Sequence, residues 1–319
     1  MNRTDGADLC GIAVNWHLES HLETLVRAWP KNPRFELIVV DNSATFATEA
    51  DGVRVLRPER NLGFGGAVNL GCAATSAPIV VTMNPDASPG PAALESLLES
   101  FERWPDVVGL APRLVGLDGR SQAYWQLRTL PSRWILLMQS LLIPAGGGAA
   151  DEPEAGTLVE QPAAAVLALR RDVLIELGGF DEDFFPAWFE DVDLATRIEA
   201  SGGKIRYAPA SVFTHILGAS VGRLGYRCFL SIYYRNLGLY LQKHHGARWA
   251  LASRALLAAS APLRILALPL RRPRRARTRR DAAVGLWLLM LDALTNWSGG
   301  NSCFNRDEYD STDGERTDA

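Results

Sequence analysis

Residues 178–198 of this 319-residue chain contain the side chains best suited to acid–base chemistry. Glu190, Asp191 and Asp193 are followed by apolar residues at helical spacing, which predicts a helix with three carboxylates in its first turn. The helix dipole favours one or two acids at that position. Large aromatic residues precede these acids, and burial among rings would raise a carboxylate pKa towards the range that a general base needs.

A second group of residues, 61–71, is rich in glycine and asparagine. Gly63, Gly65 and Gly66 would let the backbone approach a ligand closely, and a helix starting near Ala67 would offer N–H groups to an anion. The segment has neither the Gly-Lys-Ser/Thr of a Walker loop nor Gly-x-Gly-x-x-Gly spacing. A tight strand-to-helix connection explains the glycines equally well, so both interpretations stay open.

Asn84-Pro85-Asp86 directly follows a strongly apolar run. A carboxylate at the end of a strand can hold Mg²⁺ or Mn²⁺, although Asn-Pro-Asp is also an ordinary turn sequence. His215 ends another apolar segment, 24 residues after Asp191. One helix and one strand would lie between them, so both side chains can face one cleft.

Apolar runs alternate with amphipathic segments in the first half of the chain. Because the runs are apolar on both faces, they predict an α/β fold, with a mostly parallel sheet covered by helices on two sides. Ligands bind beyond the carboxyl ends of such strands, where Asn15, Asp41-Asn42-Ser43 and Asn84-Pro85-Asp86 fall. The expected strands are 9–14, 35–40, 53–56, 78–83 and 163–169, and the expected helices are 19–29, 91–104 and 171–177.

The composition is that of a globular protein, with 47% apolar and 22% charged residues. A net charge of −3 argues against a nucleic-acid binder. The four cysteines form no Cys-x-x-Cys pair, so we expect neither a zinc site nor a disulfide, and we expect a reducing compartment. We find no signal peptide and no uninterrupted apolar run of about 18 residues that would span a membrane.

Residues 221–298 have a helical pattern, interrupted by seven arginines between Arg271 and Arg280. Apolar helices beside a polybasic run indicate a segment that lies on an anionic membrane, and a helical subdomain with a solvated arginine loop explains them equally well. No aromatic residues are interleaved with the arginines, so a nucleic-acid partner is not expected. The expected divisions are a disordered N-terminus (1–8), a main domain (9–220), this helical region (221–298) and a disordered acidic tail (299–319).

Five blocks, in their order along residues 9–245, resemble the family-2 glycosyltransferases, which have the GT-A fold. Among these the chain is most similar to bacterial rhamnosyltransferases. The blocks are Val14-Asn15-Trp16; Val39-Val40-Asp41-Asn42-Ser43; Asn61-Leu62-Gly63-Phe64-Gly65-Gly66; Asn84-Pro85-Asp86; and Gly178-Gly179-Phe180-Asp181-Glu182 through Glu190-Asp191-Val192-Asp193-Leu194 to His215.

The resemblance implies a role for each block. Asp191 would be the base that deprotonates the acceptor hydroxyl, with Glu190 beside it. Asp86 would hold Mg²⁺ or Mn²⁺ on the donor diphosphate, with His215 as a further ligand. Part of the acceptor wall would come from Trp188 and Phe185, and the nucleotide sugar would lie along Asn15, Asp41, Asn42, Asn61, Gly63, Gly65, Gly66, Asn69 and Asn84.

The implied reaction is a transfer of a sugar with inversion, which needs a base on one face of the sugar and a neutralised diphosphate on the other. Asn84-Pro85-Asp86 has one carboxylate where many relatives have Asp-x-Asp, which favours dTDP-rhamnose; UDP-galactofuranose and UDP-N-acetylglucosamine stay open as donors. The acceptor would be a saccharide or a polyprenyl-linked saccharide in cell-envelope polysaccharide synthesis.

We expect the protein in the cytoplasm, or peripherally on the inner face of the cell membrane, and a homo-oligomer stays open. Two other classes stay open as alternatives to a glycosyltransferase. A nucleotidyltransferase would usually have a glycine-rich loop with a basic residue directly after the first strand, where this chain has Asn15-Trp16-His17. A non-catalytic nucleotide-sugar-binding protein would have no need of the acid pair that includes Asp191.

Overall fold

The structure is a computed structural model that describes residues 6–143, 148, 151–218, 224–270, 273–298 and 302–304. Most of the expected terminal segments 1–8 and 299–319 lie outside these residues, as do Arg271 and Arg272. The chain divides into two compact units. The sheet unit comprises Met1–Leu130, Gly147–Glu182 and Glu190–Ala219, and the helical unit comprises Pro131–Gly146, Asp183–Phe189 and Ser220–Ala319.

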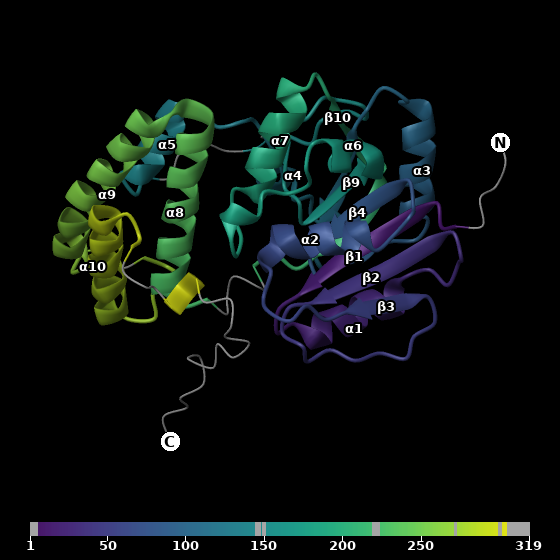
Figure 1. The fold of residues 1–319 in the computed structure, drawn as a ribbon, viewed down its shortest axis with the longest axis horizontal. Helices are drawn as coiled ribbons and strands as arrows, with labels where there is room; N and C mark the ends of the chain where they lie inside the picture. Colours follow the sequence, from purple (N-terminus) through teal and green to yellow (C-terminus); the bar gives the residue numbers. More distant parts are fainter. Residues whose placement is uncertain are drawn as a thin grey trace. The chain divides into compact units, whose positions relative to one another are not determined.

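The sheet unit is built on eight strands in the order β3-β2-β1-β4-β9-β6-β10-β5 (Figure 1). The first four of these are parallel, and β10 is parallel to β6, whereas β9 and β5 are antiparallel to their neighbours. A mostly parallel sheet is therefore confirmed. The strands are β1 (Leu9–Asn15), β2 (Phe35–Asp41), β3 (Val53–Leu56), β4 (Ile79–Met83), β5 (Ala87–Pro89), β6 (Gly109–Val115), β9 (Val166–Arg170) and β10 (Ile205–His215).

Helices cover both faces of the sheet because its central strands are apolar on both sides. Along β1, Leu9 and Ala13 belong to one core cluster, which includes residues of α1 (Glu19–Ala28) and α3 (Ala93–Arg103). Cys10, Ile12 and Val14, which alternate with them, belong to a second cluster. That cluster includes residues of α2 (Gly63–Ala73), α6 (Arg171–Glu176) and α7 (Glu190–Ala200).

The helical unit packs four helices around buried apolar side chains of its own. The helices are α5 (Arg133–Ser140), α8 (Tyr226–His245), α9 (Ala247–Ala267) and α10 (Arg279–Thr295). Ile232 and Leu237 of α8, Leu257 of α9 and Leu289 of α10 are almost completely buried. The Ser140 and Ser253 hydroxyls form a hydrogen bond of 2.7 Å that joins α5 to α9.

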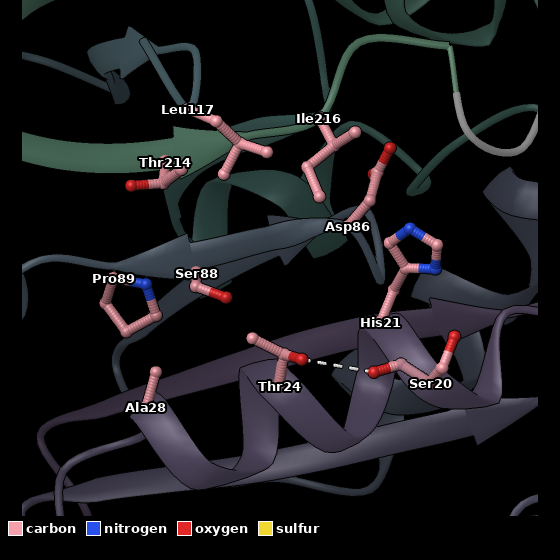
Figure 2. Close-up of a pocket in the computed structure, with 10 residues that line it drawn as sticks. All are labelled: Ser20, His21, Thr24, Ala28, Asp86, Ser88, Pro89, Leu117, Thr214 and Ile216. Atoms are coloured by element: carbon pink, nitrogen blue, oxygen red, sulfur yellow. Dashed lines mark hydrogen bonds between the residues drawn. The ribbon is translucent and has the colours of Figure 1, made fainter. Parts of the chain in front are cut away.

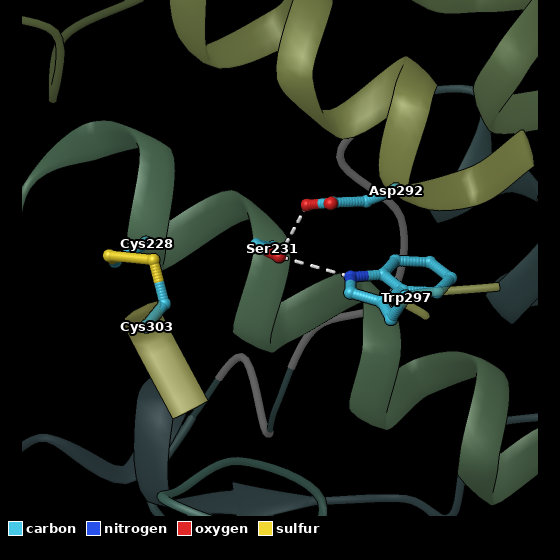
Figure 3. Close-up of a disulfide and its surroundings, with 5 residues drawn as sticks. All are labelled: Cys228, Ser231, Asp292, Trp297 and Cys303. Atoms are coloured by element: carbon cyan, nitrogen blue, oxygen red, sulfur yellow. Dashed lines mark hydrogen bonds between the residues drawn. A yellow bond between two sulfur atoms is a disulfide. The ribbon is translucent and has the colours of Figure 1, made fainter. Parts of the chain in front are cut away.

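A disulfide links Cys228 to Cys303 in the helical unit (Figure 3). The expectation that the chain has no disulfide is therefore wrong. The two cysteines are separated by 75 residues, so no local spacing revealed the pair, and the fold brings the first turn of α8 next to the segment after α10. Close by, Trp297 donates a hydrogen bond to Ser231, which donates one to Asp292.

The length and hydropathy of helix α9 disagree with the expectation that no apolar segment is long enough to span a membrane. Its 21 residues include an 18-residue window with a mean hydropathy of 1.3, so α9 meets the requirement for a membrane span by length and composition alone. Only 28% of that window is buried. The sequence interpretation gave too much weight to Arg254, Arg264 and Pro262, which interrupt the apolar run but not the helix.

Candidate functional site

The carboxyl ends of β1 and β2 carry a buried polar network. The Asn15 side chain donates hydrogen bonds to Asp41 (2.8 Å) and Ser43 (3.1 Å), and its oxygen accepts one from the backbone N–H of Leu18. The other Asp41 oxygen accepts one from the backbone N–H of Phe46 at 2.7 Å. Asn15 and Asp41 have no exposed surface. These buried side chains therefore hold the backbone of the loops that follow β1 and β2.

Asn42 joins the end of β2 to the glycine-rich segment. Its side chain donates to the backbone oxygen of Gly63 and accepts from the backbone N–H of Leu62. Asn61 accepts a hydrogen bond from the N–H of Gly63. Helix α2 begins at Gly63, four residues earlier than expected, and a side chain at Gly65 would come within 3.0 Å of Phe180 Cβ. Glycine at that position lets α2 approach the Phe180 segment closely.

The segment 178–182 is clamped from both sides. Asn69 donates to the backbone oxygen of Phe180 and accepts from its N–H, both at 2.8 Å. From α7, Arg197 donates to the backbone oxygens of Leu177 and Gly179 and forms an ion pair of 2.8 Å with buried Asp193. Both ends of the Asn69 amide thus hold the backbone in place. The role of Arg197 was missed, although Asp and Arg four residues apart on a helix were a usable signal.

Glu190 is the first residue of α7 and is 7% exposed. Its Oε2 atom accepts no hydrogen bond from the part of the chain that the structure describes. Burial, and then the charge of Asp191, raise the Glu190 pKa well above its ordinary value. The protonated form of Glu190 is therefore favoured more than that of an exposed glutamate.

Asp191 is in a more polar environment than Glu190. Burial raises its pKa, while the Arg128 guanidinium and backbone N–H groups, including that of Ala164, oppose the increase. The Gln161 side chain also donates to Asp191, at 3.4 Å. These contacts favour the charged form of Asp191, so it is the member of the acid pair that can act as a base.

Arg128 and Gln161 were missed by the sequence interpretation. They lie on two short strands, β7 (Leu127–Arg128) and β8 (Gln161–Pro162), which pair with each other in a second, two-stranded sheet. Nothing in their local spacing marks them as neighbours of the acid pair.

Asp86 and His215 lie together at the ends of β4 and β10. His215 Nε2 is 3.6 Å from Asp86 Oδ1 and 3.5 Å from the Asn84 amide nitrogen. Burial lowers the pKa of His215 to about 4, so its imidazole is neutral at physiological pH. The carboxylate oxygen suits Mg²⁺ or Mn²⁺, and the neutral imidazole nitrogen can be a further ligand of a transition metal such as Mn²⁺.

No group of three or more His, Cys, Asp or Glu residues that could hold a metal occurs in the described part of the chain. Two protein ligands suit a cation of this type, since Mg²⁺ usually keeps several waters and binds through one or two carboxylates and substrate phosphates. The residues present therefore fit a metal that is shared with a diphosphate.

The acid pair and the metal motif are joined through two consecutive residues. Asp191 accepts a hydrogen bond from the Ala164 backbone. The next residue, Ala165, accepts one from the backbone N–H of Asn84 at 2.8 Å. The candidate base and Asn84-Pro85-Asp86 are thus linked to neighbouring positions of one backbone segment.

A cavity of about 550 Å³ extends from Asp86 between α1, β5 and β10 (Figure 2). Ser88 and Thr214 are paired across β5 and β10 and contribute hydroxyl groups to its wall. His21 of α1 also lines this cavity. Asp86 is one of the residues that line this cavity, which is large enough for a small polar molecule.

Trp188 and Phe185, the expected acceptor contacts, belong to the helical unit. Phe185 is 7% exposed, and Trp188 is half-buried with its ring 5.3 Å from that of Phe229. Trp188 has a φ of 70°, in the left-handed region. The Asn236 amide of α8 donates to the backbone oxygen of Trp188, as it does to those of Phe184 and Ala187, and so holds this conformation.

Residues 18–150 match the model of a protein family described as glycosyl transferase family 2. An N-acetylglucosaminyl-diphospho-decaprenol L-rhamnosyltransferase of Mycobacterium tuberculosis is 30% identical over 287 residues, which are 81% of this chain and 92% of the relative. A pre-mycofactocin glycosyltransferase of the same species is 31% identical over 187 residues, 56% of this chain and 37% of that protein.

Two solved structures show the same fold at low sequence identity. GalNAc-T7 with UDP, GalNAc and Mn²⁺ gives a TM-score of 0.53 at 15% identity over 74% of this chain, which spans 48% of that longer protein. The mannosyltransferase PcManGT from Pyrobaculum calidifontis, in complex with GDP-Man and Mn²⁺, gives 0.50 at 17% identity. That match covers 92% of this chain and 88% of the other.

Proposed function

Because the chain belongs to glycosyltransferase family 2, we propose that it transfers L-rhamnose from dTDP-rhamnose to a lipid-linked saccharide during cell-envelope polysaccharide synthesis. The observation that carries a transferase is the acid pair joined to Asn84-Pro85-Asp86 through Ala164 and Ala165. The rhamnosyl donor and the lipid-linked acceptor are supported by the name of the 30% identical relative, of which the match covers 92%.

The reaction would be a single displacement at the anomeric carbon. Asp191 takes the proton of the acceptor hydroxyl while the hydroxyl oxygen forms a bond to the anomeric carbon. The bond from that carbon to the nucleoside diphosphate breaks, and the diphosphate leaves with the electron pair. Glu190, whose raised pKa favours its protonated form, lies beside the base. Asp86 and His215 would hold Mg²⁺ or Mn²⁺, which when bound supplies positive charge for the leaving diphosphate.

The donor would lie along the edge of the sheet, over the loops that Asn15, Asp41 and Asn42 support from beneath. Asn61, Asn84 and the backbone of Gly63, Gly65 and Gly66 would contact it. Asn69 would act through the Phe180 segment that it clamps. The sheet unit would thus carry the transfer chemistry, and Trp188 with Phe185 would contribute to the acceptor side.

The helical unit would bind the anionic inner face of the cell membrane, where a lipid-linked acceptor resides. Its α9 helix exposes Leu251, Leu263 and Leu266, each more than half exposed. Exposed arginines, among them Arg274 and Arg277, lie before α10. Apolar side chains that enter the interface and cations that meet anionic headgroups together make a peripheral membrane site.

The donor is tested by thermal stability with dTDP-rhamnose, UDP-galactofuranose and UDP-N-acetylglucosamine, each with and without Mn²⁺. A ligand at 100 times its Kd stabilises the folded chain by about 2.7 kcal/mol, which shifts the melting temperature measurably. A metal-dependent shift with dTDP-rhamnose alone is the expected result. A shift with a UDP-sugar alone would replace rhamnose as the donor, and no shift with any nucleotide sugar would contradict the proposed transfer.

A further inference from the structure

The Gln122 side chain forms two hydrogen bonds with His215, one to its backbone and one to its ring. Gln122 directly precedes the short helix α4 (Ala123–Gln126). Its amide nitrogen donates to the backbone oxygen of His215, and its amide oxygen lies opposite His215 Nδ1, both at 2.8 Å. The glutamine therefore contacts both the backbone and the ring of one residue.

This double contact fixes which imidazole nitrogen carries a hydrogen. A backbone carbonyl oxygen can only accept, so the Gln122 amide must turn its nitrogen towards it. The amide oxygen that then faces Nδ1 is also only an acceptor, so Nδ1 must be the donor. In a neutral imidazole, the other nitrogen then presents a lone pair.

That lone pair belongs to Nε2, the atom on the side of Asp86. Nε2 and Asp86 Oδ1 are 3.6 Å apart and are both electron-pair donors in this tautomer, an arrangement that suits a shared cation. The Trp125 ring, three residues after Gln122, is stacked on the imidazole at a centroid distance of 5.2 Å and an angle of 22°. Gln122 sets the tautomer, and Trp125 covers one face of the ring.

We propose that Gln122 is a positioning residue that holds His215 as the Nδ1–H tautomer, with Nε2 directed at a divalent cation shared with Asp86. This inference rests on the metal site of the proposed function and extends it by one residue. Partners of metal-binding histidines orient the ring, and their loss typically lowers metal affinity by about 10- to 100-fold.

The test compares Gln122→Met with a matched variant in helix α4, which Gln122 precedes. Gln126→Met removes a buried glutamine whose amide donates to the backbone oxygen of Pro112 instead. The Kd of Mn²⁺ is measured by electron paramagnetic resonance, alone and with dTDP or UDP. The tautomer is measured without metal, from the ¹⁵N chemical shifts of His215, with His215→Ala identifying its signals.

We expect Gln122→Met to raise the Mn²⁺ Kd about 10- to 100-fold and to remove the bias towards the Nδ1–H tautomer, while Gln126→Met changes neither. In the His215→Ala background, Gln122→Met should have no further effect on the Kd. Unchanged ¹⁵N shifts in Gln122→Met, or an equal loss of affinity in the His215→Ala background, would overturn the proposal. If the unmodified protein binds no Mn²⁺, the metal site itself is wrong, and the ¹⁵N shifts still decide the tautomer.

Discussion

Replacing Glu190 by glutamine should stabilise the protein by an amount that grows with pH. An unfolded chain loses the Glu190 proton near pH 4.5, whereas burial beside Asp191 keeps it on the folded chain to a much higher pH. Between these two pKa values the folded state binds one more proton than the unfolded state, so wild-type stability falls as pH rises. Glu190→Gln fills the same space and does not ionise, so it lacks this loss.

The magnitude follows from one proton per molecule. The difference in free energy of unfolding between Glu190→Gln and the wild type should increase by up to about 1.4 kcal/mol per pH unit above pH 4.5. The increase should stop at the pKa of Glu190 in the folded protein. In an Asp191→Asn background the gain should level off at a lower pH, because one of the two causes of the raised pKa is removed.

Urea unfolding between about pH 5 and pH 8 measures this difference. Glu199→Gln is the matched control, since Glu199 lies on the exposed last turn of the same helix. A stability difference between Glu190→Gln and the wild type that stays constant over this range would refute the reasoning. It would mean that Glu190 ionises as easily in the folded protein as in the unfolded chain.

Arg197→Met should lower the free energy of unfolding by about 3 kcal/mol, because it breaks an ion pair with the fully buried Asp193 carboxylate. Arg27→Met, which breaks an exposed ion pair, should lower it by less than about 1 kcal/mol. Equal losses of the two variants in urea unfolding would contradict this. Arg128→Met removes a charge that lowers the Asp191 pKa, so the rise of kcat/KM with pH should move to higher pH, and an unshifted profile would mean that another group titrates. Leu263→Ser with Leu266→Ser should weaken sedimentation with anionic vesicles and leave thermal stability unchanged, since both side chains are exposed; undiminished binding would exclude α9 as the membrane contact.

Much of the sheet could be predicted because its strands are short, apolar on both faces and closed by polar residues. The expected strands 9–14, 35–40, 53–56 and 78–83 match β1 to β4 within one residue at each end. The strand expected at 163–169 exists as β9, but its antiparallel direction depends on its pairing with β4 and β6. An apolar run carries no information about direction.

Candidate site residues could be proposed from the sequence where they are adjacent in it, and their partners were missed where the fold joins distant segments. Asp191 and Glu190 stand together at the start of a helix, so their pattern is local. Gln161 and Gln122 reach Asp191 and His215 from 30 and 93 residues away. The Cys228–Cys303 disulfide was missed for the same reason.

The central claim is that Asp191 is the base of a sugar transfer, and Asp191→Asn tests it most directly. Asparagine has nearly the same shape and cannot accept the proton, so turnover with dTDP-rhamnose and a polyprenyl-linked saccharide should fall by about 10²- to 10⁴-fold. The Kd of dTDP in the presence of Mn²⁺ should stay close to that of the unmodified protein. Turnover that survives in Asp191→Asn would contradict the account, because the proton must then leave through another group.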